Sequence, residues 1–479
     1  MMEVSKTTHQ NIEEAIPMNT IIHEIIEKIT VDMKNNLEDL ILEGKDISKF
    51  ILNTGKSLDE IGVKIVKEAL EILDDTIRDS KERKQEYYIQ RRNDKKTLIT
   101  KFGEVNYKRT YYKSKKDGTY EYLSDTMVGI EPYERMDLSY EAELIKESMD
   151  NSYHKSAIKV SSNTQVTKQT VLNSIRRLGN VENDDAKLST KKKEVKVIYI
   201  EADEDHVAMQ NDNNKEIKLI YVHEGKKFKS KGRYELQNKR YFTGSLKSTE
   251  DLWLEVADYL EEAYDLDKVE KVYLSGDGAS WIKEGLNWIE VSEYVLDYFH
   301  LSKYVKIATA HMPQTFTPLW NYINRHNKKY TRELLNFIIE ETKSETKKEA
   351  VIRSKKYILN NWEGIKRGYE KEYQGCSAEG HISHVLSSRL SSRPLGWSLT
   401  GADQMARLRV YNANGGDIYE LMSKRKKEKA KEERIIKLEN RTVKKRLKTT
   451  LLGTVDNIPY INDGRRTWQR QILRAIRGA

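Results

Sequence analysis

Three carboxylates that lie far apart in the sequence have the residue types expected of a divalent-metal site. Asp203 lies near the end of an apolar stretch, Asp277 lies between two glycines after another, and Glu379 lies in a segment rich in serine, histidine and arginine. Hard carboxylate oxygens select magnesium or manganese. Two such ions about 3.5–4 Å apart can activate a water or a 3′-hydroxyl and stabilise the leaving oxygen of a phosphodiester. The three residues are therefore candidates for metal-dependent phosphoryl transfer.

The first candidate belongs to residues 195–207, which begin as a buried strand and end crowded with acids. Side chains alternate along a strand, so Glu201, Asp203 and Asp205 share one face. Acids at the end of a buried strand are costly unless a cation lies there. A divalent metal would supply that charge, whereas the alternative is a strand that runs out into a polar loop. We favour Asp203 as the ligand because of its place at the strand's end, and we treat Asp205 as an accessory residue.

The bulk composition favours a soluble protein with a polyanionic partner. The chain has 479 residues, 33% charged and 38% hydrophobic, so we expect several domains with modest cores. Its 84 basic and 75 acidic side chains give a net charge of +9, which favours nucleic acid as a partner. No run approaches the roughly 18 apolar residues of a membrane span. The single cysteine, Cys376, excludes an intrachain disulfide and a multi-cysteine zinc site. We expect a cytoplasmic location without a membrane partner.

The N-terminal part of the sequence predicts helices followed by a β ribbon. Residues 1–95 form the helical region, in which the capping box at 57–60 predicts the start of a helix. Residues 96–135 change to a strand-like period, with Gly103 as a turn or bulge and Asp117-Gly118 as a hairpin turn. Basic and aromatic side chains interleave in this ribbon. It is therefore either a DNA contact or a solvated hairpin.

Residues 136–180 predict a helix-turn-helix. The first helix covers 153–160, the turn covers 161–165, and Thr167 is the N-cap of the second helix. Helix pairs of this shape also occur without DNA, but the basic charge favours DNA contact. Side chains of the types that read bases and phosphates are expected on the outer face: Lys168, Gln169, Asn173, Arg176 and Arg177.

The predicted fold class is an α/β catalytic core built on a mixed sheet, with a helical insertion and with helical and small β N-terminal regions. The first part of the core covers residues 194–302, where a three-stranded meander, with its second and third strands at 216–223 and 233–243, precedes βαβ units. Residues 303–370 return to helical periodicity and form the insertion. Residues 371–400 complete the core and carry the third acid. Residues 401–479 are a basic C-terminal region, either a solvated helix or a phosphate-contacting surface.

The segment after the insertion supplies the last acid and further candidate contacts. Glu379 is preferred to Glu363 and Glu372, because only its surroundings offer groups that could hold a phosphate backbone. Arg389 and Arg393 are predicted phosphate contacts.

Three histidines need a separate interpretation. His381 and His384 are neighbours on one helix face but lack a third zinc ligand nearby, so we interpret them as structural or DNA-facing. His300 follows Asp297 by three residues and, as a lone histidine after a strand, most often acts as a structural hydrogen-bonder.

Taken together, several stretches resemble the bacterial insertion-sequence transposases of the DDE type, close to the ISLre-type group and more distantly the Mutator-like transposases. The resemblance covers most of the chain. The stretches that carry it are Ile200-Glu-Ala-Asp-Glu-Asp-His206, Ser275-Gly-Asp-Gly-Ala279, Leu296-Asp-Tyr-Phe-His-Leu301, and Ala378-Glu-Gly-His-Ile-Ser-His384 running to Arg393-Pro-Leu-Gly-Trp397.

The resemblance implies a ribonuclease H-like catalytic domain in which the insertion precedes the last acid. It implies Asp203, Asp277 and Glu379 as the catalytic and metal-binding triad for two Mg²⁺ or Mn²⁺ ions, and it suggests an accessory role for His300 near the scissile phosphate. The expected activity is cleavage and strand transfer at the terminal inverted repeats of double-stranded DNA, by a homodimer or larger assembly at the bacterial nucleoid. The alternatives are a metal-dependent nuclease or resolvase that does not join DNA, and a non-catalytic DNA-binding regulator.

Overall fold

The structure, a computed structural model, describes residues 18–41, 46–160, 164, 166–186, 191–211, 213–230, 233–393 and 395–432. The chain divides into two compact units, residues 1–419 and 420–479. All elements discussed below belong to the first unit. Most of the predicted turn at 161–165, and the basic region from 433 onward, lie outside the described residues.

The N-terminal helices are α2 (Met18–Ile41), α3 (Ile47–Asp79) and α4 (Lys81–Glu86). The predicted helix start at Ser57 is wrong, because α3 begins ten residues earlier, where the Asp46 side chain accepts a hydrogen bond from the Ser48 N–H. No proline interrupts the helical pattern between these positions, so nothing stops the helix from running through the apparent capping box.

A three-stranded antiparallel sheet follows, in the order β1 (Tyr87–Thr100), β2 (Gly103–Ser114) and β3 (Tyr120–Glu121). The predicted helix up to residue 95 is therefore wrong. Residues from Tyr87 onward pair with β2, and a partner strand overrides local helix preference. Gly103 forms the first turn and Gly118, with a φ of 72°, lies in the second, as predicted.

Four helices lead toward the central sheet: α5 (Leu123–Val128), α6 (Leu138–Ser148), α7 (Tyr153–Val160) and α8 (Lys168–Leu178). The predicted pair of helices at 153–178 is confirmed. Thr167 caps α8 by accepting a hydrogen bond from the Thr170 N–H. Val171 and Ile175 are buried against the neighbouring helices.

The central sheet has five strands in the order β10-β9-β4-β5-β8. Strands β4, β9 and β10 run parallel, whereas β5 is antiparallel to both β4 and β8. The predicted third strand at 233–243 is divided, because residues 226–236 form a separate hairpin of β6 and β7. The strand bounds are β4 (Val197–Ala208), β5 (Asn214–His223), β6 (Lys226–Ser230), β7 (Arg233–Leu236), β8 (Arg240–Thr243), β9 (Lys271–Gly276) and β10 (Ser292–Leu296).

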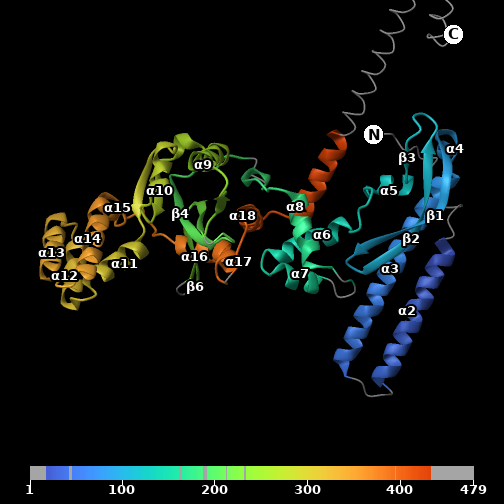
Figure 1. The fold of residues 1–479 in the computed structure, drawn as a ribbon, viewed down its shortest axis with the longest axis horizontal. Coiled ribbons are helices and arrows are strands. Elements are labelled where there is room, and N and C mark those ends of the chain that lie inside the picture. The colour runs from blue at the N-terminus through green and yellow to red at the C-terminus, as the bar shows by residue number, and fades with distance from the viewer. Residues whose placement is uncertain are drawn as a thin grey trace, which may run out of the picture. The chain divides into compact units, whose positions relative to one another are not determined.

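Two layers of helix cover the faces of this sheet. Ile200 and Ala202 of β4 belong to a hydrophobic core that includes Trp253 of α9 (Thr249–Ala263) and Ile282 of α10 (Ser280–Glu284). The acids of β4 point to the opposite face, against the segment that carries α16 (Ala378–Ile382). Figure 1 shows α9 and α10 on one side of β4 and α16 and α17 on the other.

The predicted insertion is helical and shares the core of the sheet. It consists of α11 (Tyr298–Thr309), α12 (Phe316–Asn324), α13 (Lys328–Glu341), α14 (Glu345–Asn360) and α15 (Trp362–Arg367). After α16 the chain makes a π-helical turn, η5 (Ser383–Ser387), and continues as α17 (Ser388–Leu390). Helix α18 (Leu399–Ala413) is buried along residues 402–408, so the core extends beyond its predicted end at 400.

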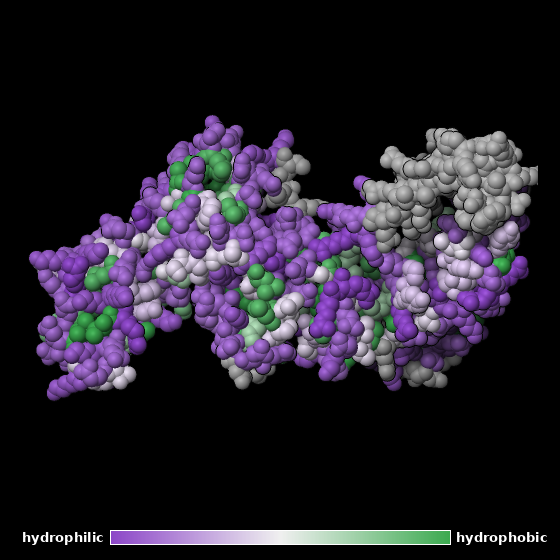
Figure 2. Space-filling model, turned by 45° about the horizontal axis from the view of Figure 1, so that its top comes forward, coloured by the Kyte–Doolittle hydropathy of each residue, from purple (hydrophilic) through white to green (hydrophobic). Residues whose placement is uncertain are grey.

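The surface is mostly polar. On the face drawn in Figure 2, hydrophilic residues prevail and hydrophobic residues gather in small separate patches. Among the helices that the structure describes, none is both long enough and apolar enough to cross a bilayer.

Gly276 at the end of β9 permits the close approach of β4 and α10. A Cβ atom there would lie 2.8 Å from the Ala202 carbonyl oxygen and 2.6 Å from Ile282 Cδ1. We expect Gly276→Val to lower the free energy of unfolding by about 1–3 kcal/mol, the usual cost of overpacking. Urea denaturation measures the change. Gly55→Ala in α3 is the control, since no atom lies within 4 Å of its Cβ position and the substitution should stabilise the helix. Equal stability of Gly276→Val and the wild type would contradict the proposed packing.

Candidate active site

Strands β9 and β10 end at the same edge of the sheet and each is followed by an aspartate, whereas the parallel strand β4 carries Asp203 level with that edge and runs on to Ala208. The predicted position of Asp203 at the end of its strand is therefore wrong, because the residues after it still pair with β5. Glu201 of β4 pairs with Ser275 of β9, and Leu296 of β10 pairs with Gly276. Extending both registers places Asp203, Asp277 and Asp297 side by side at this edge. Adjacent strands lie about 4.8 Å apart. The three carboxylates therefore crowd one end of the sheet.

The pKa of Asp203 reflects this crowding of carboxylates. Its carboxylate is only 8% exposed. Burial raises its pKa from 3.8 to about 7; the Glu204 N–H and His300 oppose this shift, and the negative charges of Asp277 and Glu379 add to it. Asp277 and Glu379 therefore both lie within electrostatic reach of Asp203.

The segment after the insertion runs along the acidic face of β4 and delivers Glu379. Residues later in this segment contact residues later in β4. Glu379 comes two residues after Ser377, which contacts Glu201. Glu379 itself is exposed, at the start of α16. The contacts that fix this course are Tyr199 Oη with the Glu372 carbonyl, Ser377 N–H with Glu201, Ser391 Oγ with Asp205 at 2.8 Å, and Gln210 N–H with the Trp397 carbonyl at 2.9 Å.

Glu201 is a positioning residue. It is 1% exposed and accepts hydrogen bonds from Tyr221 Oη, from His223 Nε2 at 3.0 Å and from the Ser377 N–H. The Gly225 N–H donates to His223 Nδ1, so Nε2 carries the proton that Glu201 accepts. Burial alone would raise the pKa of Glu201, but these hydrogen bonds lower it below its ordinary value. Through the hydrogen bond from Ser377, this carboxylate holds the segment that carries Glu379 against β4.

The two carboxylate oxygens of Asp205 differ in their hydrogen bonding. Its Oδ1 accepts from Ser391 Oγ, whereas its Oδ2 is buried and has no hydrogen-bond partner among the described residues. A buried carboxylate oxygen without a donor is costly. Together with the raised pKa of Asp203, this orphaned oxygen indicates an acidic site that a bound cation would stabilise.

The donor set fits hard divalent ions, although the predicted triad is not in single-ion geometry. Among the described residues, the group with all ligand atoms within 4.8 Å of one another is Glu204, His206 and Glu216, which is partly exposed. Ligands on opposite ions of a two-metal site lie up to roughly 8 Å apart, from ion–ion and Mg–oxygen distances. A two-metal site therefore tolerates a wider spread of carboxylates than a single-ion site does.

His300 lies at the same edge. Its Nδ1 is 3.0 Å from Asp297 Oδ2, and Asp297 also caps α11 by accepting from the Phe299 N–H. The hydrogen bond to Asp297 raises the pKa of His300; burial opposes it, and the charges of Asp297, Asp203 and Asp277 raise it further. The sequence alone had not singled out Asp297 as a site residue, although it follows an apolar strand as Asp277 does.

The predicted DNA-contacting residues divide into exposed and buried positions. Arg393 is exposed, and so are Lys168, Gln169, Asn173, Arg176 and Arg177 of α8. Arg177 also forms an ion pair with the buried Glu141 at 3.3 Å.

Arg389 differs from the prediction of phosphate contact, because it is only 6% exposed. It lies over the rings of Tyr153 and Trp397 and donates to the Ser148 carbonyl at 2.9 Å. It ties α17 to the helix pair instead, which favours a structural role. The π-helical turn before it shifts the helix register. Arg409 of α18 donates to the His384 and Val385 carbonyls in that turn.

His381 and the cysteine are structural, whereas the side chain of His384 is exposed. His381 Nδ1 is 2.7 Å from Tyr241 Oη, and burial lowers its pKa to about 4. The Cys376 thiol is 3.3 Å from Glu201, within the network that holds the segment. Of the alternatives for the last acid, Glu363 pairs with Lys366 at 2.8 Å, and Glu372 contributes its carbonyl to Tyr199.

The raised pKa of Asp203 predicts a pH-dependent stability. Because the folded-state pKa exceeds the unfolded value, this group's contribution is fully present below about pH 4 and is lost as the pH rises through about 7. In EDTA, Asp203→Asn should therefore be more stable than the wild type at pH 8, by up to about 4 kcal/mol, and the difference should vanish at low pH.

Urea denaturation between pH 4 and pH 8 measures this difference, and Asp258→Asn at an exposed position of α9 is the control. Magnesium should reduce the advantage of the variant at pH 8. A constant difference between Asp203→Asn and the wild type across this range would contradict the assignment.

Comparisons with other proteins identify the family. A UPF0236 protein of Caldanaerobacter subterraneus subsp. tengcongensis is 42% identical over 453 residues, which is 94% of this chain and 96% of the relative; its name joins eleven locus labels of one strain. Another from the same strain, with four labels, is 42% identical over 92% of this chain and 94% of its own length. A UPF0236 protein in a vanSb 3′ region of Streptococcus gallolyticus is 25% identical over 76% of this chain and 85% of its own. The sequence model described as "Uncharacterised protein family (UPF0236)" matches residues 40–451, and the chain belongs to this family, which has many paralogues in one genome.

Proposed function

We propose that this protein is a DDE-type DNA transposase that binds the terminal inverted repeats of an insertion sequence and catalyses strand cleavage and strand transfer. The observation that carries the proposal is the convergence of Asp203 of β4, Asp277 after β9 and Glu379 of a later helix in one electrostatic neighbourhood. Crowded carboxylates that lack a counter-ion suit divalent-metal catalysis on phosphodiesters.

The topology supports a ribonuclease H-like core. The antiparallel strands β8, β5 and β4 continue into the parallel strands β9 and β10. The helices α11–α15 lie between β10 and Glu379, as expected for an insertion before the last acid. Active sites of open sheets with parallel strands lie at the carboxyl ends of those strands. Asp277 directly follows β9, and the strand register puts Asp203 of β4 level with it.

Each residue has a role in this proposal. Asp203, Asp277 and Glu379 would hold two Mg²⁺ or Mn²⁺ ions, which supply activation of the attacking hydroxyl and stabilisation of the leaving oxygen when bound. Glu201 holds the Glu379 segment on β4. His300, kept in place by Asp297, can hold a proton beside the acids. Helix α8 presents Lys168, Gln169 and Arg176 to a DNA groove.

The copy number of the relatives supports a mobile element. Two relatives carry names that join eleven and four locus labels of the same strain. A gene that moves its own DNA accumulates in such copies, which favours a transposase over a nuclease or a regulator. Synapsis of two element ends would require a homodimer or a larger assembly on DNA.

Strand transfer tests the proposal. Purified protein, Mg²⁺ or Mn²⁺ and a duplex carrying the DNA that flanks the gene should give nicked ends, and a pre-cut end should be joined to a target duplex. Asp277→Asn should lower the rate by about 100-fold or more, the scale of losing one group that stabilises a transition state. Glu363→Gln, at an exposed acid paired with Lys366, should retain wild-type activity.

Three outcomes would contradict the proposal. Cleavage without joining would indicate a nuclease, and DNA binding without any nicking would indicate a regulator. Full activity of Asp277→Asn would remove the triad from the reaction.

A further inference from the structure

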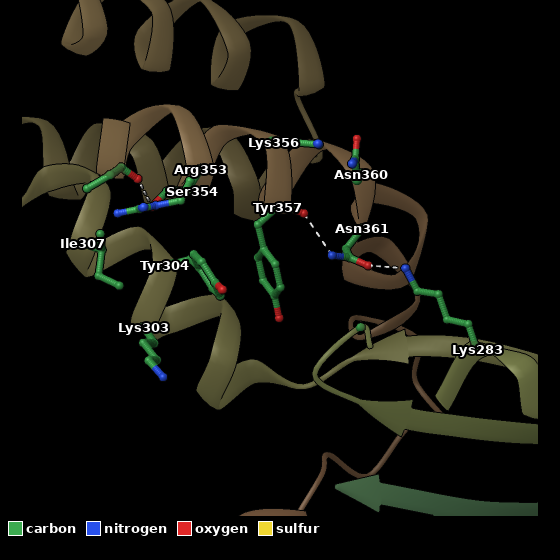
Figure 3. Close-up of a pocket in the computed structure, with 12 residues that line it drawn as sticks. Lys283, Lys303, Tyr304, Ile307, Arg353, Ser354, Lys356, Tyr357, Asn360 and Asn361 are labelled. Carbon is green, nitrogen blue, oxygen red and sulfur yellow. Dashed lines mark hydrogen bonds between the residues drawn. The ribbon is translucent and has the colours of Figure 1, made fainter. Parts of the chain in front are cut away.

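A pocket of about 500 Å³ opens beside the acidic edge, between the end of β9 and the helices α10, α11 and α14. Figure 3 shows the side chains that line it, which come from both the sheet and the insertion. The residues important here are Lys283, Lys303, Tyr304, Arg353, Lys356 and Tyr357.

The pocket is strongly basic. Four of its side chains are lysine or arginine, and no acidic side chain lines it. Lys283 donates a hydrogen bond to the neutral Asn361 Oδ1 at 2.7 Å and lies over the ring of Tyr294. Lys303, Arg353 and Lys356 are exposed and form no ion pair with any residue that the structure describes. Uncompensated positive charge in a concave site attracts an anion.

The pocket adjoins the candidate active site directly. Gly278, the residue after Asp277, lines it, and Tyr357 Oη donates a hydrogen bond to the Asp277 carbonyl. Tyr357 stacks on Tyr304 with ring centroids 3.7 Å apart, and both rings line the pocket. Gly278 has a φ of 96°, and a Cβ there would lie 3.0 Å from Asn361 Oδ1.

We propose that this pocket holds backbone phosphates of the DNA strand that passes the acidic edge. The inference rests on the proposed function and adds a specific contact surface to it. The acids alone repel a phosphodiester, so the strand must gain attraction from positive charge nearby. The rim charges come from two different helices, α11 and α14, and therefore suit an extended strand better than a single small anion.

Salt-dependent DNA binding tests the contact. Binding of a labelled duplex is measured by fluorescence anisotropy in EDTA over a range of KCl concentrations. The variants are Lys303→Gln, Arg353→Gln and Lys356→Gln. Each lost phosphate contact should reduce the slope of log K against log[KCl] by about 0.9. Lys306→Gln on α11 and Lys347→Gln on α14 replace exposed lysines outside the pocket and should keep the wild-type slope.

The outcomes separate this inference from the proposed function, because binding is measured without metal and without cleavage. Unchanged slopes in all three pocket variants would overturn the inference even if strand transfer is observed. Reduced slopes would support it even in a protein that cuts nothing. Calorimetry with inorganic phosphate adds a second arm: phosphate binding that Lys303→Gln abolishes, with DNA binding unchanged, would assign the pocket to a small phosphorylated ligand and overturn the DNA contact.

Discussion

The buried carboxylate of Glu201 is the interaction on which the candidate site depends. It joins β4, β5 and the segment after the insertion through hydrogen bonds from Tyr221, His223 and Ser377. Removing one partner of a buried, hydrogen-bonded charge typically costs about 3–5 kcal/mol. Such a bond can therefore hold Glu379 near residues that lie more than a hundred positions earlier. A single residue, Ala378, separates Ser377 from Glu379, so the third acid has little freedom of position.

Charged groups are distributed unevenly around Glu201. Glu201 is fully bonded, whereas Asp203 is buried beside other acids and has its pKa raised to about 7. The uncompensated lysines and arginine of the neighbouring pocket carry the opposite charge. Neither the crowded acids nor the clustered basic side chains stabilise the protein without a ligand. Functional sites commonly retain groups that lower stability in this way. A cation at the edge and a phosphate chain in the pocket would relieve both.

The sequence predicted well those features that depend on local pattern. The strand that carries Asp203, the glycine-flanked turn at Asp277 and the N-cap at Thr167 each have a short-range signature and are all present, although the strand continues beyond Asp203 to Ala208. The predicted insertion is also helical, since its apolar spacing is long and regular.

Features that depend on distant partners were missed. Residues 87–95 are strand because β2 lies beside them, and the strand predicted at 233–243 is broken by a separate hairpin. Arg389 points inward because a π-helical turn precedes it and Tyr153 and Trp397 enclose it. The role of Glu201 required the position of Ser377, which only the tertiary fold supplies.

Manganese binding at equilibrium tests the central claim most directly, since free Mn²⁺ can be counted by its electron paramagnetic resonance signal. Mixtures of protein and duplex DNA near neutral pH should bind two Mn²⁺ ions per chain, and Asp203→Asn should lose this binding. His206→Ala, which disrupts the partly exposed group of Glu204, His206 and Glu216, should retain both ions. Manganese binding that survives Asp203→Asn but disappears in His206→Ala would contradict a metal site at the edge of the sheet.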